Sequence, residues 1–284
     1  MTLSITLAAP WGIYQSCDFQ VQTVNSDRTL TLQLRASVKQ VHIMYSSWQG
    51  LISYSGVGQA CGADTHKWLV DWLKHDSGQR DLEEVAEIIR SKGSQWLAQI
   101  YRDKGILYRH TFIIGAFVGR KPHVILISNY ERVNNTPQLK AADRLFITST
   151  QPREPQIFIT GIPEAVSDKD RKTLKILLRA KPEPEVLHRA MAKVNQAAAL
   201  STKVHNGISE ACLAHSIYPD NKGTSQPYGE VNEALSLQSL MQGQDTGELV
   251  RNFLKEYTGG NMANVRIVQT ASAFSQPTQE GKGD

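Results

Sequence analysis

The sequence contains few cysteines: three in 284 residues, at Cys17, Cys61 and Cys212. Because they are far apart and odd in number, they do not indicate a disulfide framework, and their scarcity is typical of a reducing compartment. The sequence also lacks any apolar run near the ~18 residues of a membrane helix. Its N-terminus has no basic segment followed by an apolar stretch, which would mark a secretory signal. We therefore expect a cytoplasmic protein that does not contact a membrane.

An excess of charge of one sign is also lacking. The formal net charge is +4, and no dense cluster of Lys and Arg interleaved with aromatic residues occurs, which disfavours nucleic acid as a partner. Apolar residues make up 40% and charged residues 20% of the chain, a composition typical of a globular protein with a core. The length allows one large domain or two small ones.

Short alternating segments fill the first 55 residues. Alternation of apolar and polar residues predicts β-strands, because successive side chains point to opposite faces of a strand. We expect a meander of strands at residues 3–8, 11–18, 29–34, 39–45 and 49–55, with turn residues at 23–28.

A helical period replaces this alternation after residue 60. Trp68 and Trp72 recur at helical spacing, and Asp81 with Glu84 forms a capping-box pattern that opens a second helix. Further strands are expected at 110–118, 123–130, 143–150, 156–161 and 212–219, and further helices at 167–180 and 184–200.

This order of strands, two helices, strands, two helices and a strand differs from the regular βαβ alternation of a parallel sheet. It predicts an α+β fold in which two antiparallel sheets lie between two helix pairs, a four-layer αββα sandwich. Residues 1–219 form this domain in our interpretation, and residues 220–284 form a C-terminal extension. In the extension we expect a helix at 246–258, a strand at 265–270 and a disordered polar tail from about residue 275.

Thr2 follows the starting methionine and heads the first predicted strand. A threonine hydroxyl is a poor nucleophile unless a base takes its proton. If a methionine aminopeptidase removes Met1, as the small size of threonine permits, the free α-amine of Thr2 could be that base, since such amines titrate near ~7.7–8.0. The chemistry would also need a cation beside the hydroxyl, a carboxylate to hold the cation, and backbone N–H groups for an oxyanion. We expect removal of Met1 and no self-cleavage of a longer leader.

Three later segments supply residues of these types in order. SCDFQVQT contains Asp18, KQVHIMY opens with Lys39, and SYSGVGQA places Gly56 at a strand-to-helix turn. In order and spacing, these segments resemble those of proteasome β-subunits and their bacterial relatives, the N-terminal-nucleophile (Ntn) hydrolases. The resemblance covers residues 2 to 219 and implies the same αββα fold. It implies Thr2 as the nucleophile, Gly56 N–H as an oxyanion donor, and Asp18 holding Lys39 beside the Thr2 hydroxyl.

Two further segments match the family less closely. QIFITGIP places Thr160 before a glycine where the family has a Ser-Gly pair, and VHNGISEA places Asn206 and Ser209 where it has an Asp followed by a Ser. By resemblance, Thr160, Asn206 and Ser209 would support the amine and a catalytic water. Asn206 cannot supply a negative charge, and Gln20 stands where an Arg is common, so the sequence departs from the family at both positions.

The resemblance implies a threonine-type peptidase or amidohydrolase that cleaves amide bonds through an acyl-enzyme ester, without metal or cofactor. It also implies a peptide or protein substrate and a homo-oligomeric ring, and it leaves an unfoldase partner open. The alternative is a non-catalytic scaffold or binding subunit of the same fold. The trio Thr2, Asp18 and Lys39 favours the hydrolase, because a scaffold has no need to keep it.

Two other kinds of site are disfavoured. SGVGQACG has the spacing G-x-G-x-x-x-G rather than that of the dinucleotide-binding fingerprint. His205, Cys212 and His215 match no standard zinc spacing and lack a fourth ligand. His110 and His123 lie on predicted strands, and the sequence identifies no partner for either.

Overall fold

The computed structural model describes residues 2–20, 22–24, 30–32, 38–60, 63–74, 79–131, 140–201, 207–229 and 238–248. Most of the predicted helix at 246–258 lies outside these residues, and the predicted strand at 265–270 and the polar tail lie wholly outside them. None of the helices in the described part combines the length and the apolar character that a membrane crossing requires.

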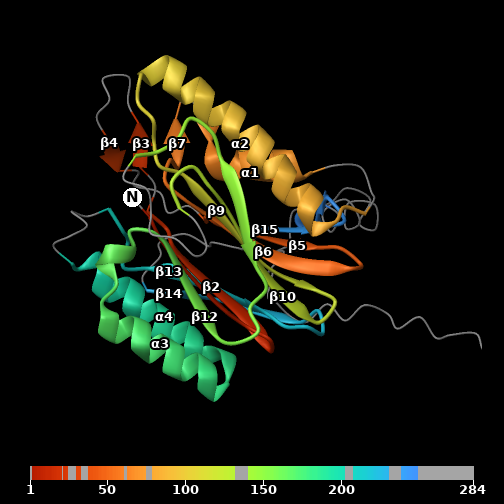
Figure 1. Cartoon of the computed structure of the whole chain (residues 1–284). Coiled ribbons are helices and arrows are strands. Elements are labelled where there is room, and N and C mark those ends of the chain that lie inside the picture. The colour runs from red at the N-terminus through yellow and green to blue at the C-terminus, as the bar shows by residue number, and fades with distance from the viewer. Residues whose placement is uncertain are drawn as a thin grey trace, which may run out of the picture.

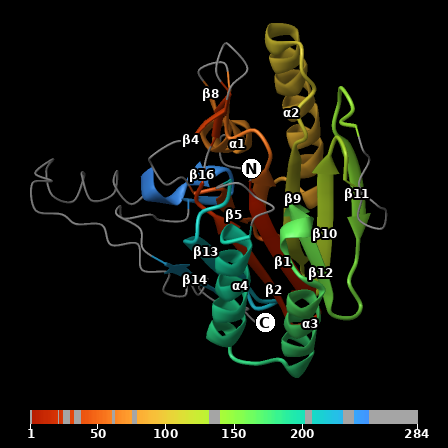
Figure 2. The ribbon, with the colours of Figure 1, turned by 90° about the vertical axis from the view of Figure 1, so that its left-hand side faces the viewer.

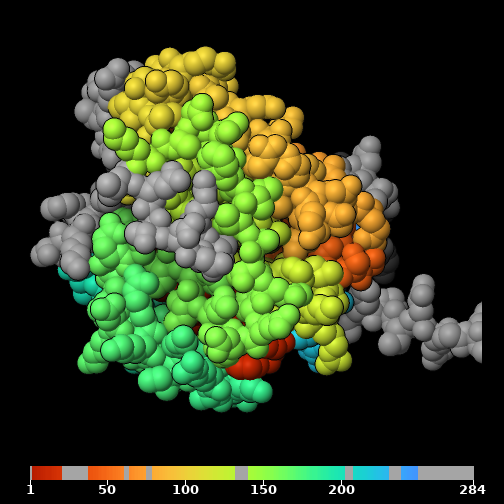
Figure 3. Space-filling view, viewed as in Figure 1, coloured from red at the N-terminus to blue at the C-terminus, as the bar shows by residue number. Residues whose placement is uncertain are grey.

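The N-terminal strands lie in a five-stranded antiparallel sheet, with the strand order β12-β1-β2-β13-β14. Every residue of β1 and β2 is buried, and on the face of the molecule in Figure 3 the N-terminal segment, in red, is visible in a small area. The bounds are Gln156–Gly161 for β12, Leu3–Ala9 for β1, Gly12–Asp18 for β2, Cys212–Ile217 for β13 and Gly223–Tyr228 for β14.

A seven-stranded sheet packs against this one, with the strand order β11-β10-β9-β6-β5-β15-β16. It is a mixed sheet, because β15 pairs in parallel with β5 while the other neighbours are antiparallel. The bounds are Phe146–Thr150 for β11, Lys121–Ser128 for β10, Thr111–Val118 for β9, Trp48–Ser55 for β6, Gln40–Met44 for β5, Gln238–Met241 for β15 and Gln244–Asp245 for β16.

A third, small sheet has the strand order β4-β3-β7-β8. Its strands are Leu30–Leu32, Gln22–Val24, Gln59–Ala60 and Ala63–Asp64, and β3 pairs in parallel with β7. In both ribbon views the N-terminal end of the chain lies close to this sheet (Figures 1 and 2).

Two pairs of helices pack on the outer faces of the larger sheets. In Figure 1, α1 and α2 lie on the side of β9 and β10, and α3 and α4 lie on the side of β2, β12, β13 and β14; β11, which also contacts α2, is labelled in Figure 2. The helices are Thr65–Leu73 (α1), Leu82–Lys104 (α2), Asp168–Ala180 (α3) and Pro184–Ala199 (α4), and a short 3-10 helix, η1, spans Pro163–Ala165.

Local sequence signals explain where these helices begin and end. The predicted capping box of α2 is confirmed: Asp81 Oδ1 accepts a hydrogen bond from Glu84 N over 2.7 Å, and Glu84 Oε2 accepts one from Asp81 N over 2.9 Å. Helix α2 ends at Gly105, whose φ of 67° is left-handed and therefore suits glycine. Pro184 occupies the first turn of α4, where its missing N–H has no helical partner to lose.

Both apolar and polar contacts join the two large sheets. Apolar side chains meet between them, among them Ile13 of β2 and Phe117 of β9. Buried polar groups also pair across the gap: Ser4 Oγ lies 2.8 Å from Ser53 Oγ, and Gln40 Nε2 donates to the Gln15 carbonyl oxygen over 3.1 Å. Because an unpaired buried polar group is costly, these bonds fix how β1 and β2 sit against β5 and β6.

The predicted fold class is wrong. The expected four-layer αββα sandwich has two antiparallel sheets, whereas the larger sheet is mixed and a third sheet with a parallel pair is present. Strands rather than helices dominate, with four α-helices and one 3-10 helix in the described residues. The difference arises largely because β15 returns along the edge of β5 and extends that sheet in the parallel sense.

Candidate active site

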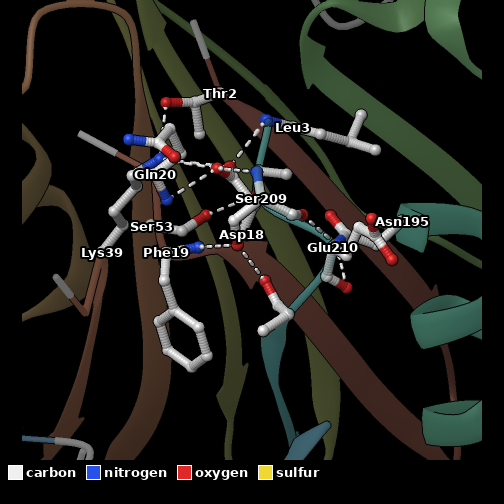
Figure 4. A network of polar contacts seen from close by, with 12 residues as sticks. Thr2, Leu3, Asp18, Phe19, Gln20, Lys39, Ser53, Asn195, Ser209 and Glu210 are labelled. Atoms are coloured by element: carbon white, nitrogen blue, oxygen red, sulfur yellow. Dashed lines mark hydrogen bonds and ion pairs between the residues drawn. The ribbon is translucent and has the colours of Figure 1, made fainter. Parts of the chain in front are cut away.

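Thr2, Asp18 and Lys39 meet where the two large sheets approach each other at one end. Thr2 immediately precedes β1, Asp18 is the last residue of β2, and Lys39 immediately precedes β5 of the other sheet. The three residues are separated by up to 37 positions in the sequence, and the packing of the sheets brings them together (Figure 4).

Lys39 contacts both of the other residues. Its Nζ donates to Thr2 Oγ1 over 2.8 Å, and it lies 3.1 Å and 3.2 Å from the two carboxylate oxygens of Asp18. All three side chains are buried, with exposed fractions of 3% for Thr2, 0% for Asp18 and 1% for Lys39. A fully buried lysine is rare unless it is paired, and here the carboxylate supplies that pair.

Asp18 also accepts hydrogen bonds from the backbone on three sides. Its Oδ1 accepts from Leu3 N over 2.9 Å, and its Oδ2 accepts from Gln20 N over 2.9 Å and from Ser209 N over 3.4 Å. These donors offset the cost of taking the carboxylate out of water. The carboxylate therefore holds Lys39 and, through Leu3 N, the backbone next to Thr2.

Cys17 immediately precedes Asp18 on β2, but its thiol is not activated as a nucleophile. Burial raises the pKa of the Cys17 thiol to about 11, so the thiol is neutral near pH 7. Its neighbours Ser4 and Ser53 hydrogen-bond each other across the sheets. Thr2 is thus the hydroxyl in contact with the buried ammonium.

Gly56 lies in a turn beside the N-terminal strand. Its φ of 113° is left-handed, and a Cβ built on it would lie 2.3 Å from the Arg109 carbonyl oxygen, so only glycine fits there. The preceding residue, Ser55, and the Thr2 carbonyl oxygen both lie against Gly161, where an added Cβ would be 3.1 Å and 1.9 Å from them. The turn that begins at Ser55 therefore lines the same end of the molecule as Thr2.

Thr160 lies on β12 next to β1, where it pairs with Ser4, and Gly161 pairs with Leu3. Thr160 is 2% exposed, and within the described residues its Oγ1 has no hydrogen-bond partner. Thr160 therefore lies beside the strand that Thr2 heads, and its side chain makes no hydrogen bond to Thr2.

Ser209 supports Asp18 rather than Thr2. Its N–H donates to the Asp18 carboxylate, its Oγ donates to the Ala211 carbonyl oxygen over 2.5 Å, and the same Oγ accepts from Phe19 N over 3.3 Å. Asn206, the other residue of the predicted pair, lies outside the described residues.

Two sets of hydrogen bonds that support this site were not predicted from the sequence. Asn195 of α4 donates from Nδ2 to the carbonyl oxygens of Ser209 and Glu210, over 2.8 Å and 3.2 Å, and so holds the segment that donates to Asp18. Val57 N, in the glycine turn, donates to His110 Nδ1 over 3.2 Å. Both contacts join residues far apart in the sequence, so no local pattern reveals them.

Metal-ligating side chains do not converge in the described part of the chain: no group of three His, Cys, Asp or Glu residues could hold a metal ion there. Cys212 and His215 both lie on β13 three positions apart, so strand alternation places their side chains on opposite faces of the sheet. His205 lies outside the described residues.

No family model matches the chain, and no curated protein matches it. Similar solved structures include Anbu (ancestral beta-subunit) from Yersinia bercovieri, with a TM-score of 0.49, 10% identity, and coverage of 94% of this chain and 99% of the other. They also include Anbu from Hyphomicrobium sp. strain MC1, with a TM-score of 0.48, 8% identity, and coverage of 94% and 100%. The catalytic domain of the serine threonine protein phosphatase PstP, in complex with two manganese ions, has a TM-score of 0.36, 15% identity, and coverage of 69% and 95%.

These comparisons overturn the predicted family membership. The sequence resemblance implied a proteasome β-subunit-like Ntn hydrolase, but no family model supports that assignment, and it is wrong as stated. The similar structures are distant and include a phosphatase domain as well as the two Anbu proteins. TM-scores this low establish neither a shared fold nor a shared function, so the function must be argued from the site itself.

Proposed function

We propose that the chain is an N-terminal threonine hydrolase that cleaves an amide bond through an ester on Thr2. The observation that carries the proposal is the 2.8 Å contact between Lys39 Nζ and Thr2 Oγ1, with Asp18 holding the same Nζ in a buried site. A buried ion pair costs desolvation energy. Its placement against a hydroxyl at the N-terminus supports a chemical rather than a purely structural role.

The proposed reaction begins with removal of Met1, which frees the α-amine of Thr2. Lys39 donates a hydrogen bond to Thr2 Oγ1, so the hydroxyl proton points elsewhere and passes to the α-amine, directly or through a water. Oγ1 then attacks the carbonyl carbon of the amide. The ammonium of Lys39 stabilises the charge that develops on Oγ1.

The remaining steps return the protein to its starting state. The protonated α-amine gives its proton to the leaving nitrogen as the C–N bond breaks, which leaves an ester between Oγ1 and the acyl group. The α-amine then takes a proton from water as the water attacks the ester carbonyl, and it returns this proton to Oγ1 as the bond between Oγ1 and the acyl carbon breaks and the acid leaves. The Gly56 N–H is proposed to stabilise the oxyanion in both steps. We also propose that the substrate is a peptide or protein and that the chain assembles into a ring-shaped homo-oligomer.

The test is the intact mass of the purified protein before and after treatment with a peptide epoxyketone, which captures a hydroxyl and an adjacent free amine together. We expect loss of Met1 and one stoichiometric adduct. Thr2→Ser should retain the adduct, and Thr2→Ala should abolish it. A protein that keeps Met1 contradicts the proposal, as does a processed protein that neither forms the adduct nor hydrolyses any member of a mixed fluorogenic peptide-amide library.

A further inference from the structure

The turn at Gly56 is held by a side chain from a distant strand. Val57 N–H is buried and donates to His110 Nδ1 over 3.2 Å. A Cβ built on Gly56 would lie 2.9 Å from that same Nδ1. His110 therefore packs directly under the glycine as well as accepting the next residue's N–H.

The carbonyl oxygens of Val57 and of the next residue are also held by hydrogen bonds. Thr65 Oγ1 donates to the Val57 carbonyl oxygen over 2.7 Å, and Thr65 N donates to the Gly58 carbonyl oxygen over 2.9 Å. Glycine has more backbone freedom than any other residue, so the conformation at Gly56 depends on what holds its neighbours. His110 and Thr65 together remove that freedom.

His110 is itself rigidly held. Its N–H donates to Asn129 Oδ1 over 2.9 Å. Its ring is enclosed by Phe112, with centroids 4.6 Å apart, and by Trp96, at 5.1 Å, both in edge-on arrangements. Burial lowers the pKa of His110 to about 3, so the ring is neutral near pH 7 and Nδ1 keeps the lone pair that accepts the Val57 N–H.

The held turn lies beside the nucleophile. Ser55, the residue before Gly56, and the carbonyl oxygen of Thr2 both lie against Gly161, where an added Cβ would be 3.1 Å from Ser55 Cβ and 1.9 Å from the Thr2 oxygen. The backbone of Gly161 in turn hydrogen-bonds the buried carboxyl of Glu131, and Thr111, which follows His110, donates to Glu131 Oε2 over 2.6 Å. Residues 110 and 111 thus support Gly56 and Gly161, and Gly161 lies directly against Thr2.

We propose that His110 is a positioning residue, which holds Val57 so that the N–H of Gly56 faces the oxyanion formed on the substrate. His110 touches neither substrate nor reacting atoms and acts through the turn. The catalytic part of this inference rests on the proposed function of Thr2. The anchoring of the turn rests on the hydrogen bond to Val57 and is measurable without any activity.

The experiment compares His110→Leu with His110→Asn. Leucine removes the acceptor, whereas asparagine retains one, because its Oδ1 is bonded to Cγ as Nδ1 is in histidine. Amide hydrogen exchange of Val57 should speed up about tenfold in H110L, as expected for a lost hydrogen bond, and should stay near the wild-type rate in H110N. If H110L does not fold, His110→Gln replaces it, since its carbonyl lies one bond further from the backbone, and the same acceleration is expected.

Turnover gives the second readout. Loss of an oriented oxyanion donor should lower kcat about 10²-fold in H110L with little change in KM, and H110N should recover most of kcat. His188→Leu is the matched control: His188 is also a buried histidine, with an exposed fraction of 1%, but it lies on α4. H188L should leave both Val57 exchange and kcat close to their wild-type values.

The outcomes separate this inference from the proposed function. Unchanged Val57 exchange in H110L overturns the anchoring, whatever the activity. Faster exchange with unchanged kcat overturns the positioning role. If the wild-type protein forms no adduct and shows no turnover, the proposed function and the positioning role both fail, while faster Val57 exchange in H110L alone still supports the anchoring.

Discussion

Asp18 Oδ1 accepts a hydrogen bond from Leu3 N–H over 2.9 Å. The same carboxylate receives the ammonium of Lys39, which contacts the hydroxyl of Thr2. One buried side chain thus orients both the backbone that follows Thr2 and the cation beside its hydroxyl. Asp18 ends β2 while Leu3 begins β1, so the hairpin between these strands fixes the relationship.

The ion pair of Asp18 and Lys39 should matter more for turnover than for stability. Asp18→Asn or Lys39→Met alone should lower the free energy of unfolding by about 3–5 kcal/mol, because each leaves the partner charge buried and uncompensated. The double variant D18N/K39M should recover a large part of this loss but no turnover. Urea unfolding of the wild type, the two single variants and the double variant gives the coupling energy.

The matched control for this cycle is the exposed pair of Lys222 and Asp220, 2.9 Å apart with exposed fractions of 65% and 53%. Asp220→Asn should change the unfolding free energy by less than about 0.5 kcal/mol, since exposed pairs contribute little. Additive effects of D18N and K39M would contradict the buried coupling.

Gly161 should tolerate no side chain. A Cβ there would lie 1.9 Å from the Thr2 carbonyl oxygen at a φ of +90°, so Gly161→Ala must displace Thr2 or distort β12. We expect a loss of several kcal/mol in unfolding free energy (roughly 3 or more) from strain and overpacking together, and a large fall in epoxyketone labelling of Thr2. Gly119→Ala is the control, because Gly119 also has a positive φ, of +56°, but has nothing within 4 Å of an added Cβ. G119A should cost only about 1–2 kcal/mol and leave labelling intact.

The strand meander and the trio were predictable from the sequence for different reasons. Alternation located β1 and β6 to within about two residues, because each has a regular apolar period, and β2 was located between Pro10 and the turn residues that follow it. The meeting of Thr2, Asp18 and Lys39 was implied by resemblance, since no periodicity states which strand ends come together. The same resemblance gave the wrong family, and it shared the wrong fold class with the prediction made from the order of strands and helices.

The missed elements and contacts lack a local signal. Strand β14, Gly223–Tyr228, has an intermediate or exposed position at every residue, and β15 has four residues and a parallel partner in β5. Neither carries the alternation that marks a half-buried strand. The bond from Val57 N to His110 spans 53 positions, and it depends on tertiary packing that the spacing of residues does not encode.

Stability should fall as the pH falls from neutrality. Burial lowers the pKa of His42 and His188 to about 4 and that of His110 to about 3, and it lowers the pKa of His215 well below its usual value. These histidines stay neutral in the folded state while the unfolded state binds protons below about pH 6.5. Each therefore removes about 1.4 kcal/mol per pH unit between pH ~6.5 and pH ~4. Burial raises the pKa of Glu131, so this carboxyl binds a proton more readily in the folded state and favours folding as the pH falls. The four histidines outweigh this single opposing group.

Urea unfolding at pH 7, 6 and 5 measures this dependence. His188→Asn should reduce the slope by about one proton, because it removes one group that titrates only in the unfolded state. His123→Gln should change the slope less, since His123 is partly exposed and its pKa is lowered by a less complete burial. A stability that is level between pH 7 and pH 5 would show that these rings are hydrated or paired in solution.

Asn195 should link α4 to the reactivity of Thr2. Its Nδ2 holds the carbonyl oxygens of Ser209 and Glu210, and Ser209 N donates to Asp18. Asn195→Ala leaves these two carbonyls without that donor and should lower the unfolding free energy by about 1–3 kcal/mol. It should also loosen Asp18, so the rate of epoxyketone labelling should fall about tenfold.

The neighbouring residue supplies the control for Asn195. Gln196 is exposed, and its Nε2 donates to a side chain of the same segment, Glu210 Oε2, over 3.4 Å. Gln196→Ala should therefore leave both stability and labelling near their wild-type values, because an exposed hydrogen bond is readily replaced by water. Labelling that falls equally in N195A and Q196A would mean that the helix surface, and not the buried amide, controls the segment. Labelling that falls only in N195A would place α4 in the support of the site, through a chain of contacts that runs from Asn195 by way of Ser209 and Asp18 to Thr2.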